Sequence, residues 1–259
     1  MNTLPVPFDV RLMNFTASVL FGAVVLGTLA TGLWWALRHP AFALAGITVQ
    51  GDLNHTSEVS LRTQVAPKLA GNFFTVDLRQ ARAAFETVPW VRKALVQREF
   101  PNRLKVVLEE HKGVAFWGQE RDSRLVNSYG EVFEANIGEL ESDDLPYLSG
   151  PEGQAAQVLT MVRSLAPALE PLGATLDELE LSARGGWRAR LDSGATIELG
   201  SGTVAEVRER TLRFVRTLPQ VTGKQGRNPR DLLTADLRYG DAYAVRLRGV
   251  TTGDAVKKK

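Results

Sequence analysis

The longest apolar run in the chain extends from Phe15 to Leu37 and contains no charged residue. A helix of this length spans roughly 35 Å, which is enough to cross a hydrocarbon core of about 30 Å. Trp34 and Trp35 lie at its C-terminal end, where aromatic rings favour the membrane interface, and Pro40 follows as a helix stop. The pattern therefore predicts a transmembrane helix over 15–37.

A buried core helix and a cleaved signal peptide are the other interpretations of this run. Core helices rarely run so long without a polar face. The sequence at 41–43 resembles a cleavage site, but the run is longer than the roughly 7–15 apolar residues of a signal peptide. We therefore predict an uncleaved signal anchor behind a flexible cytoplasmic segment, 1–14.

The charges that flank the run do not fix its orientation. Asp9 and Arg11 precede it and Arg38 follows it, so the positive-inside bias is close to a tie. The long C-terminal part can be translocated behind a signal anchor. We therefore expect the short N-terminal end to lie in the cytoplasm.

The pattern between 42 and 111 predicts a compact mixed unit. Alternating apolar residues indicate strands, and apolar stripes at helical spacing indicate helices capped by Thr56 or Ser57 and by Asp77. Prolines end both helices. The predicted order is strand, helix, helix, strand and strand, at 47–50, 58–66, 78–87, 91–100 and 104–109.

Residues 112–250 predict a second domain, a mostly antiparallel β-sheet with flanking helices. Amphipathic patterns predict two helices, at 154–166 and 204–218. Pro167 is expected to end the first helix, and Thr203 and Glu206 form a capping box for the second. The strands are expected at 114–117, 124–127, 132–133, 178–182, 187–191, 195–199, 232–239 and 242–248.

Composition agrees with a folded chain and narrows the function classes. Hydrophobic residues make up 44% and charged residues 23%, as in globular proteins. The net charge of +2 gives no strong field for nucleic acid, and the absence of cysteine does not fix the compartment. The predicted order of strands and helices assigns the chain to the α+β class, with one membrane anchor, two modest domains and a disordered tail at 251–259.

The residues that catalysis requires are not gathered in a recognisable pattern. His39, His55 and His111 lack the spacing of metal ligands, and there is no cysteine to act as a nucleophile. The adjacent carboxylates at 109–110 and 143–144 diverge on a strand or crowd in a loop. We therefore expect no catalysis, no metal and no cofactor.

Two patterns imitate ligand sites and have simpler interpretations. Residues 200–205 fit the G-x-G-x-x-A dinucleotide pattern, but an antiparallel meander precedes them, and the acid expected about 20 residues later is missing. We interpret them as a tight turn before a capped helix. The arginines between 208 and 216 alternate with glutamates and are interpreted as a solvated helix face.

Several segments carry a family resemblance. Those that resemble a POTRA domain are ITVQG at 47–51, FFTVDL at 73–78 and VPWVRKALVQREFPNRLKVVLEEHK at 88–112. Those similar to the FtsQ/DivIB family of bacterial cell-division proteins are LVNSYGEVFEA at 125–135, LPYLSGPEG at 145–153 and DLRY at 236–239. A single POTRA domain behind one transmembrane span fits the plan of that family. The resemblance implies a POTRA domain over 42–111 and the family's C-terminal domain over 112–250.

The resemblance also implies a function, that of a non-enzymatic divisome scaffold. Such a protein holds the FtsB/FtsL complex at the septum, links early cytoplasmic to late periplasmic division proteins, and contacts others through its POTRA domain and membrane helix. It is a single-pass type II protein of the inner membrane, without nucleic acid or a small-molecule substrate. Two other functions stay open: a chaperone-like POTRA module of a secretion or outer-membrane assembly system, and an anchored cell-wall hydrolase.

The last predicted strand is the candidate docking site for a partner. A strand before a disordered tail is expected at a sheet edge, where unpaired backbone groups can accept a further strand. Alternation places Tyr243, Val245 and Leu247 on one face, expected to point inward. It places Ala242, Ala244, Arg246 and Arg248 on the other face.

The FtsQ/DivIB resemblance implies that FtsB docks at this edge and at the loop before the nearby helix. The implied contact residues are Tyr239, Asp241, Ala242, Tyr243, Ala244, Val245, Arg246, Leu247 and Ser201. Ser201 stands where the family often has a basic residue. The alternative is that the strand merely closes the sheet and that Arg246 and Arg248 are solvated.

Overall fold

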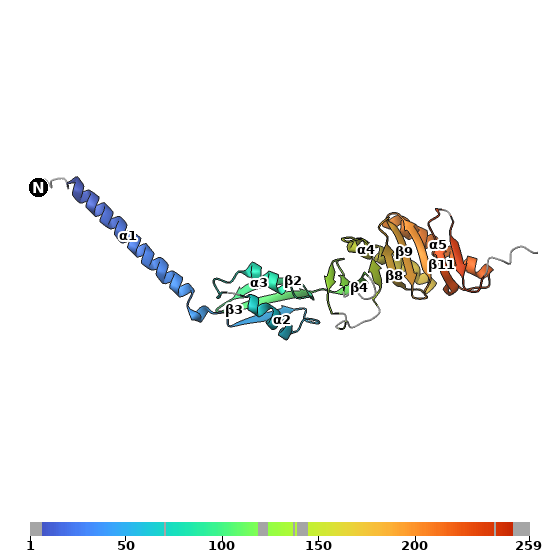
Figure 1. Ribbon diagram of the computed structural model, residues 1–259, viewed down its shortest axis with the longest axis horizontal. Helices are drawn as coiled ribbons and strands as arrows, with labels where there is room; N and C mark the ends of the chain where they lie inside the picture. The colour runs from blue at the N-terminus through green and yellow to red at the C-terminus, as the bar shows by residue number, and fades with distance from the viewer. Residues whose placement is uncertain are drawn as a thin grey trace, which may run out of the picture. The chain divides into compact units, whose positions relative to one another are not determined.

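The computed structural model describes residues 7–69, 71–118, 124–136, 138, 145–240 and 242–250 (Figure 1). The chain divides into two compact units, Met1–Glu110 and His111–Lys259. The predicted tail at 251–259 and the predicted site residue Asp241 lie outside the described residues.

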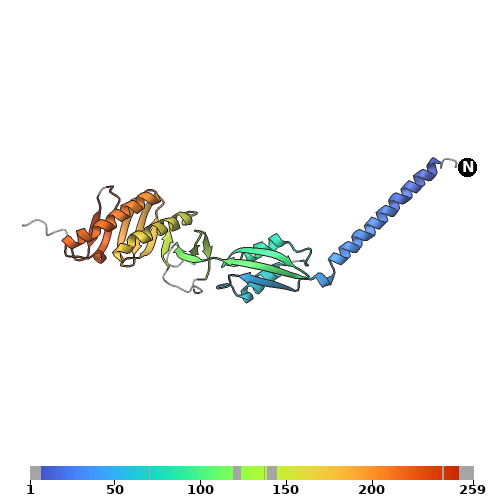
Figure 2. The ribbon, with the colours of Figure 1, turned by 180° about the vertical axis from the view of Figure 1, so that it is seen from behind.

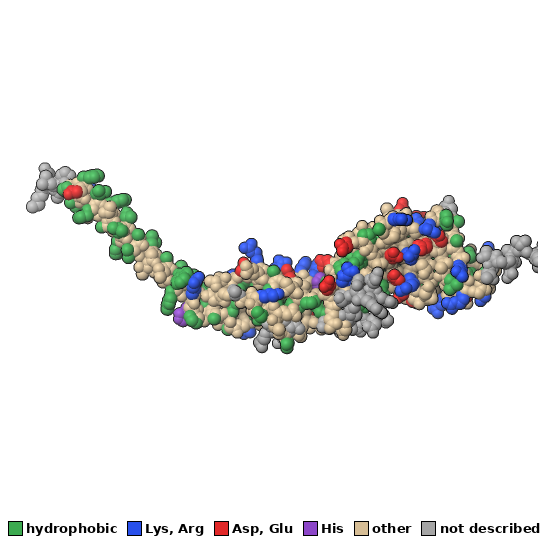
Figure 3. All heavy atoms as spheres, in the orientation of Figure 1, with side chains coloured by type: hydrophobic (Ala, Val, Ile, Leu, Met, Phe, Trp, Pro, Cys, Tyr) green, Lys and Arg blue, Asp and Glu red, His purple; other side chains and the backbone are tan. Residues whose placement is uncertain are grey.

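The N-terminal helix α1, Phe8–Leu37, is long and apolar enough to cross a membrane, by its length and composition. None of its side chains is buried, and Figure 3 shows hydrophobic side chains along it. The helix begins earlier than predicted, so residues 8–14, which we assigned to a flexible segment, are helical. Pro7 precedes the first turn, and the Arg11 N–H donates to its carbonyl at 3.2 Å. Extending an existing helix needs no new nucleation, which explains the added turns.

After α1, the described residues of the first unit form a three-stranded sheet with two helices, and we use "first unit" below for this part of the chain. Its elements are β1 Gly46–Gly51, α2 Glu58–Val65, α3 Leu78–Phe85, β2 Val91–Glu99 and β3 Arg103–Glu110, with short 3₁₀ turns at Pro40–Phe42 and Ala66–Lys68. The strand order is β1-β3-β2, in which β1 runs parallel and β2 antiparallel to β3. The predicted β-α-α-β-β order is therefore confirmed.

Local sequence and packing together place these elements. The Asp77 carboxylate caps α3 by accepting the N–H groups of Arg79 and Gln80, at 2.8 and 3.3 Å. Phe85 on α3 is buried with Leu104 and Val106 of the central strand β3. Because every second residue of β3 points toward the helices, one face of the sheet forms the core of this unit.

In the second unit, the described residues form one sheet of nine strands with two long helices. Its strands are β4 Gly113–Trp117, β5 Arg124–Asn127, β6 Val132–Glu134, β7 Tyr147–Ser149, β8 Leu176–Leu181, β9 Gly186–Leu191, β10 Thr196–Ser201, β11 Leu232–Asp236 and β12 Ala244–Leu247. Its helices are α4 Ala155–Leu169 and α5 Val204–Lys224, with 3₁₀ turns at Glu170–Leu172 and Pro229–Asp231.

The strand order is β12-β11-β10-β9-β8-β7-β4-β5-β6. Neighbours are antiparallel except for β10–β11, β7–β8 and β4–β7, which are parallel. The sheet is thus mixed with antiparallel pairs in the majority, and the predicted α+β class is confirmed. The order leaves β12 at one edge and β6 at the other.

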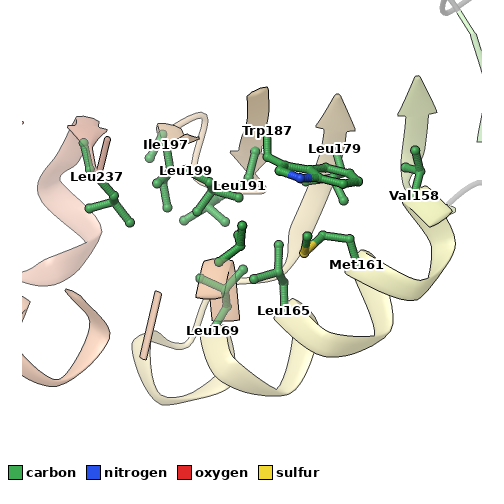
Figure 4. Packing of buried hydrophobic residues seen from close by; sticks show 14 of the residues in the cluster. Val158, Met161, Leu165, Leu169, Leu179, Trp187, Leu191, Ile197, Leu199 and Leu237 are labelled. Carbon is green, nitrogen blue, oxygen red and sulfur yellow. The ribbon is translucent and has the colours of Figure 1, made fainter. Parts of the chain in front are cut away.

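Figure 2 shows α4 and α5 beside each other against one face of this sheet. In Figure 4, Met161 and Leu165 of α4 point toward the Trp187 ring of β9. Trp187 and Phe214, from α5, are among the largest fully buried side chains of the unit. The core therefore lies between the sheet and the two helices.

The other face of the sheet carries ion pairs between strands. Arg188 on β9 bonds to Glu198 on β10 at 2.7 Å and to Glu180 on β8 at 3.3 Å. Arg190 pairs with Asp177 at 3.1 Å. The hydrogen bond and attraction of Glu198 raise the pKa of Arg188. Figure 3 shows such charged side chains gathered on the second unit, so this face is adapted to solvent.

Both long helices of the second unit extend beyond their predicted ends, 166 and 218, and each passes through a proline. Helix α4 continues past Pro167 to Leu169, and α5 continues past Pro219 to Lys224. Each proline removes one backbone hydrogen bond. Buried side chains beyond it, Leu169 in α4 and Thr222 in α5, hold the last turns in the fold. Tertiary packing therefore overrides the local stop signal.

Three further strand predictions need correction. The short strand β7 was not predicted, because it has only three residues and lies between a proline and a glycine. Strand β11 ends at Asp236, not Tyr239, and β12 begins at Ala244, not Ala242. The bidentate contact of Asp236 with Arg238 turns the chain out of the ladder. The DLRY segment is thus partly a loop.

Candidate functional site

Strand β12 is one of the two edge strands of the nine-stranded sheet. It pairs with β11 in the register Asp236–Ala244, Ala235–Val245 and Thr234–Arg246. In the strand order of the described residues, no strand lies on its other side. An edge of this kind can accept a further strand from a partner.

Two backbone hydrogen bonds determine which groups of β12 point to the open side. The Arg248 N–H donates to the Asp231 carbonyl at 2.8 Å, so Arg248 faces β11. Because successive residues of a strand alternate, Arg246 and Ala244 also face β11, and Val245 and Leu247 face outward.

A hydrogen bond between β11 and β10 leads to the same assignment of directions for the backbone groups. The Leu237 N–H donates to the Glu198 carbonyl of β10 at 2.8 Å. Ala235 therefore faces β10, while Thr234 faces β12. The Leu247 carbonyl accepts the Val250 N–H at 3.3 Å in a turn. The groups open to a partner are therefore the N–H and carbonyl of Val245 and the N–H of Leu247.

The side chains of β12 alternate as predicted. Leu247 is buried, and Tyr243 and Val245 pack against the core of the unit. Ala244 and Arg246 are exposed on the opposite face. The exposed face therefore has a small residue, which lets another chain approach, beside a cation, which attracts acidic side chains.

Tyr243 attaches the start of β12 to helix α5. Its hydroxyl lies 2.7 Å from Thr217 Oγ1, and its ring meets Phe214 edge-on with centroids 5.1 Å apart. Both partners come from one face of α5. The predicted site residue Tyr243 therefore supports the edge from inside and does not offer its ring to a partner.

The loop before β12 is held by two arginines. Arg238 Nη2 lies 2.6 Å from Asp236 Oδ2, and the hydrogen bond from Arg238 holds the pKa of the Asp236 carboxyl below its usual range. Arg213 on α5 donates to the Gly240 carbonyl at 2.9 Å. Tyr239, between these contacts, is 62% exposed. An ordered loop therefore presents this ring to solvent.

Ser201 ends β10, and β11 lies between its strand and β12. The Arg210 guanidinium of α5 donates to the Leu199 carbonyl and, at 3.2 Å, to the Ser201 carbonyl. A Cβ on Gly200 would lie 3.4 Å from Arg238 Cα. The loop of Ser201 thus adjoins the DLRY loop, and the structure brings Ser201 near that part of the predicted site.

The turn after Ser201 has the predicted capping box. The Thr203 hydroxyl accepts the Glu206 N–H at 3.3 Å, and Glu206 accepts the Thr203 N–H at 2.8 Å. The hydrogen bonds from Thr203 lower the pKa of Glu206. Gly200 and Gly202 have φ angles of +78° and +138°, which residues other than glycine rarely adopt. These contacts account for the glycine pattern as a turn.

The residues considered for catalysis have structural partners. The buried Glu110 carboxylate accepts the Thr56 N–H at 2.8 Å, and His55 stacks on Trp90 with centroids 4.0 Å apart. Among the described residues, no three His, Asp or Glu side chains are placed to hold a metal ion. The carboxylates at 143–144 lie outside the described residues.

Sequence reasoning missed the contribution of α5 to this site. Arg213 and Thr217 are one helical turn apart and reach the loop and the edge strand from one face of α5. We interpreted Arg210 and Arg213 as a solvated face, whereas both donate to backbone carbonyls. Their spacing was visible in the sequence, but their targets depend on tertiary packing.

Comparison with known proteins identifies the family. Residues 115–238 match the family profile described as "Cell division protein FtsQ/DivIB, C-terminal", and residues 42–111 match "POTRA domain, FtsQ-type". The cell division protein FtsQ of Burkholderia pseudomallei is 42% identical over 243 residues, which cover 93% of this chain and 94% of that protein. The chain belongs to the FtsQ/DivIB family. The resemblance drawn from its sequence is therefore confirmed.

Other FtsQ proteins match over similar lengths. That of Thiomonas arsenitoxydans is 38% identical over 247 residues, covering 95% of this chain and 90% of the relative. That of Bordetella pertussis is 36% identical over 257 residues, covering 92% of each. The family match therefore extends into both units, and its C-terminal part ends at Arg238, within the DLRY segment.

Proposed function

We propose that this member of the FtsQ/DivIB family is a non-enzymatic scaffold of the division machinery that holds the FtsB/FtsL complex. FtsB adds a strand to the open edge of β12. The observation that carries this proposal is the bond from the Arg248 N–H to the Asp231 carbonyl at a sheet edge, because alternation along β12 then directs the Val245 N–H and carbonyl outward. The proposed contact surface comprises the predicted residues Tyr239, Asp241–Leu247 and Ser201, and the side chains of Tyr243 and Leu247 support it from inside.

Electrostatics support a partner with acidic side chains. Arg246 is exposed on the same side of the edge as Ala244, and Arg248 follows it. A carboxylate on an added strand can pair with either guanidinium. Since rim charges act chiefly on association rates, the backbone pairing supplies the attachment and the arginines guide the encounter.

The membrane anchor completes the proposed scaffold. With its short end in the cytoplasm, α1 holds both units on the periplasmic side of the inner membrane at the division septum. Anchoring turns each further contact into an effectively intramolecular one, which strengthens weak interfaces. We assign the POTRA domain to 42–111 and the partner-binding domain to 112–250, and the POTRA domain and α1 provide contacts to other division proteins.

Binding of the FtsB/FtsL complex to the full chain in lipid nanodiscs tests this function. In Ala244→Asp, a charged carboxylate stands on the exposed face of the edge strand. The expected result is at least a tenfold loss of affinity, about 1.4 kcal/mol, because the added strand must pack beside it.

Ser193→Asp is the matched control. Ser193 is exposed in the turn between β9 and β10, and β10 and β11 separate β9 from the edge strand. The affinity of this variant should equal that of the unaltered chain. Binding that survives Ala244→Asp overturns the edge site, and no binding by the unaltered chain overturns the scaffold function for these partners.

A further inference from the structure

Three aromatic side chains gather at one end of the first unit. Phe42 lies at the end of the 3₁₀ turn that follows α1. Phe74, in the loop before α3, is 42% exposed, and Phe100, in the turn between β2 and β3, is 79% exposed. We call these three residues the aromatic patch. Exposed rings that cluster in this way mark a contact surface more often than isolated ones do.

Backbone contacts bring the three segments together. The Phe73 N–H donates to the Phe42 carbonyl at 2.9 Å, and the Ala45 N–H donates to the Asn102 carbonyl at 2.9 Å. The rings of Phe42 and Phe74 meet edge-on, with centroids 4.9 Å apart. The loop before α3 and the β2–β3 turn are therefore both joined to the segment that leaves α1.

The patch is held in place while the rings of Phe74 and Phe100 stay exposed and that of Phe42 is half-buried. Arg98 on β2 donates to the carbonyls of Phe73 at 2.7 Å and Val76 at 2.8 Å, which fixes the loop on both sides of Phe74. The Phe100 ring lies edge-on to Phe73, with centroids 6.3 Å apart. Hydrogen bonds from Arg98 therefore fix the loop in a conformation that leaves the Phe74 ring exposed.

The short connection between α1 and the aromatic patch indicates that the patch contacts the membrane. Phe42 follows Leu37 by five residues, so it lies within roughly 18 Å of the end of the helix. Trp34 and Trp35 in the last turn of α1 mark the depth of the membrane interface. The Asn72 side chain, in the loop of Phe74, donates to the Leu37 carbonyl at 2.5 Å. The patch therefore cannot leave the neighbourhood of the bilayer that α1 crosses.

We propose that the aromatic patch inserts into the headgroup region of the lipid bilayer and seats the first unit on the membrane surface. Aromatic rings favour this region, and an apolar surface there lies about 5–10 Å deep. The contact limits the swing of the unit about the short segment after α1. The proposal goes beyond partner binding at β12 and rests only on α1 as the membrane span.

Spin labels on single cysteines test this contact, because the chain has no cysteine of its own. The full chain carrying Phe74→Cys or Phe100→Cys is labelled and reconstituted into vesicles of phosphatidylethanolamine and phosphatidylglycerol, without any other protein. Collision rates with oxygen, which enriches in lipid, and with a water-soluble nickel chelate are then measured. The oxygen-to-nickel ratio at both positions should be several-fold higher than for a label in water.

Two further positions calibrate the result. Val59, in the first turn of α2, is 75% exposed and follows the opposite end of β1, so Val59→Cys reports an exposed apolar site away from the patch. Leu26→Cys reports the middle of α1. Equal ratios at 59, 74 and 100 overturn the proposal. A nickel-accessible label at 26 contradicts the membrane span itself and overturns it as well.

Discussion

The Tyr243 hydroxyl lies 2.7 Å from Thr217 Oγ1, so a side chain at the entry to the edge strand is hydrogen-bonded to the helix that covers the sheet. The same ring meets Phe214 of that helix edge-on. An edge strand forms ladder hydrogen bonds on one side only, and the contacts of Tyr243 with α5 compensate for part of the missing stabilisation. The edge is therefore ordered before a partner arrives, which lowers the entropy cost of binding.

Tyr243→Phe removes the hydroxyl and keeps the ring contact with Phe214. Loss of one partly buried hydrogen bond should lower the opening free energy of β12 by about 1 kcal/mol. Native-state hydrogen exchange at Ala244 and Arg246 measures this. Tyr239→Phe, at an exposed ring, should leave exchange in β12 unchanged. Equal effects of the two changes would show that the Thr217 contact contributes nothing.

Gly200→Ala tests the packing of Arg210 under the Ser201 loop. The new Cβ would lie 2.7 Å from Arg210 Nη1 at a φ of +78°, so the guanidinium must leave its two carbonyls. We expect a loss of more than about 2 kcal/mol in unfolding free energy. Gly194→Ala is the control, because Gly194 has a φ of +81° with nothing within 4 Å of its Cβ.

The left-handed backbone alone should cost the control about 1–2 kcal/mol. Urea unfolding followed by hydrogen exchange of the second unit compares the two variants, and the excess loss at Gly200 measures the displaced arginine. A Gly200→Ala variant no less stable than Gly194→Ala would contradict the role of Arg210.

The Asp236–Arg238 pair makes the stability of the DLRY loop depend on acid pH. The pKa of Asp236 is lowered from an ordinary value of 3.8, chiefly by the hydrogen bond from Arg238. A lowered pKa contributes stability above the unfolded value, and this is lost as pH falls through the folded value. The unaltered chain should therefore be more stable than Asp236→Asn at pH 7, and the difference should vanish well below pH 3.8.

Urea unfolding of both chains between pH 7 and pH 2 checks this window. Protonation of other groups changes both chains alike, so only the difference between them reports Asp236. If the stability difference between the unaltered chain and Asp236→Asn grew as pH fell, it would contradict a lowered pKa of Asp236.

Arg246→Glu should slow association with the FtsB/FtsL complex, because it reverses a charge beside the open edge. The expected change is roughly tenfold in association rate at low salt and less at physiological salt. Arg208→Glu, on the exposed side of α5, changes net charge equally and serves as control. Rate measurements at two ionic strengths separate this local effect from the effect of net charge.

Local signals in the sequence were sufficient for much of the fold. The cap at Asp77, the box at Thr203 and the alternation from Tyr243 to Leu247 act within a few residues, and all appear as predicted. The family resemblance then identified both domains. Such features are predictable because neighbouring residues alone determine them.

Long-range packing determined what the sequence did not reveal. Strand β7 gains its place from parallel neighbours β4 and β8, far from it in the chain. The helices pass Pro167 and Pro219 because their final turns are buried. The contact of Arg213 with Gly240 joins a helix to a loop that only the folded sheet brings together.

Residue-resolved hydrogen exchange of the full chain in nanodiscs, with and without the FtsB/FtsL complex, tests the central claim most directly. In the free chain the Val245 and Leu247 amides face the open edge and should exchange quickly, while those of Ala244 and Arg246 face β11 and exchange slowly. Strand addition predicts strong new protection at Val245 and Leu247. A bound complex that leaves these two amides exchanging as before would contradict docking at β12.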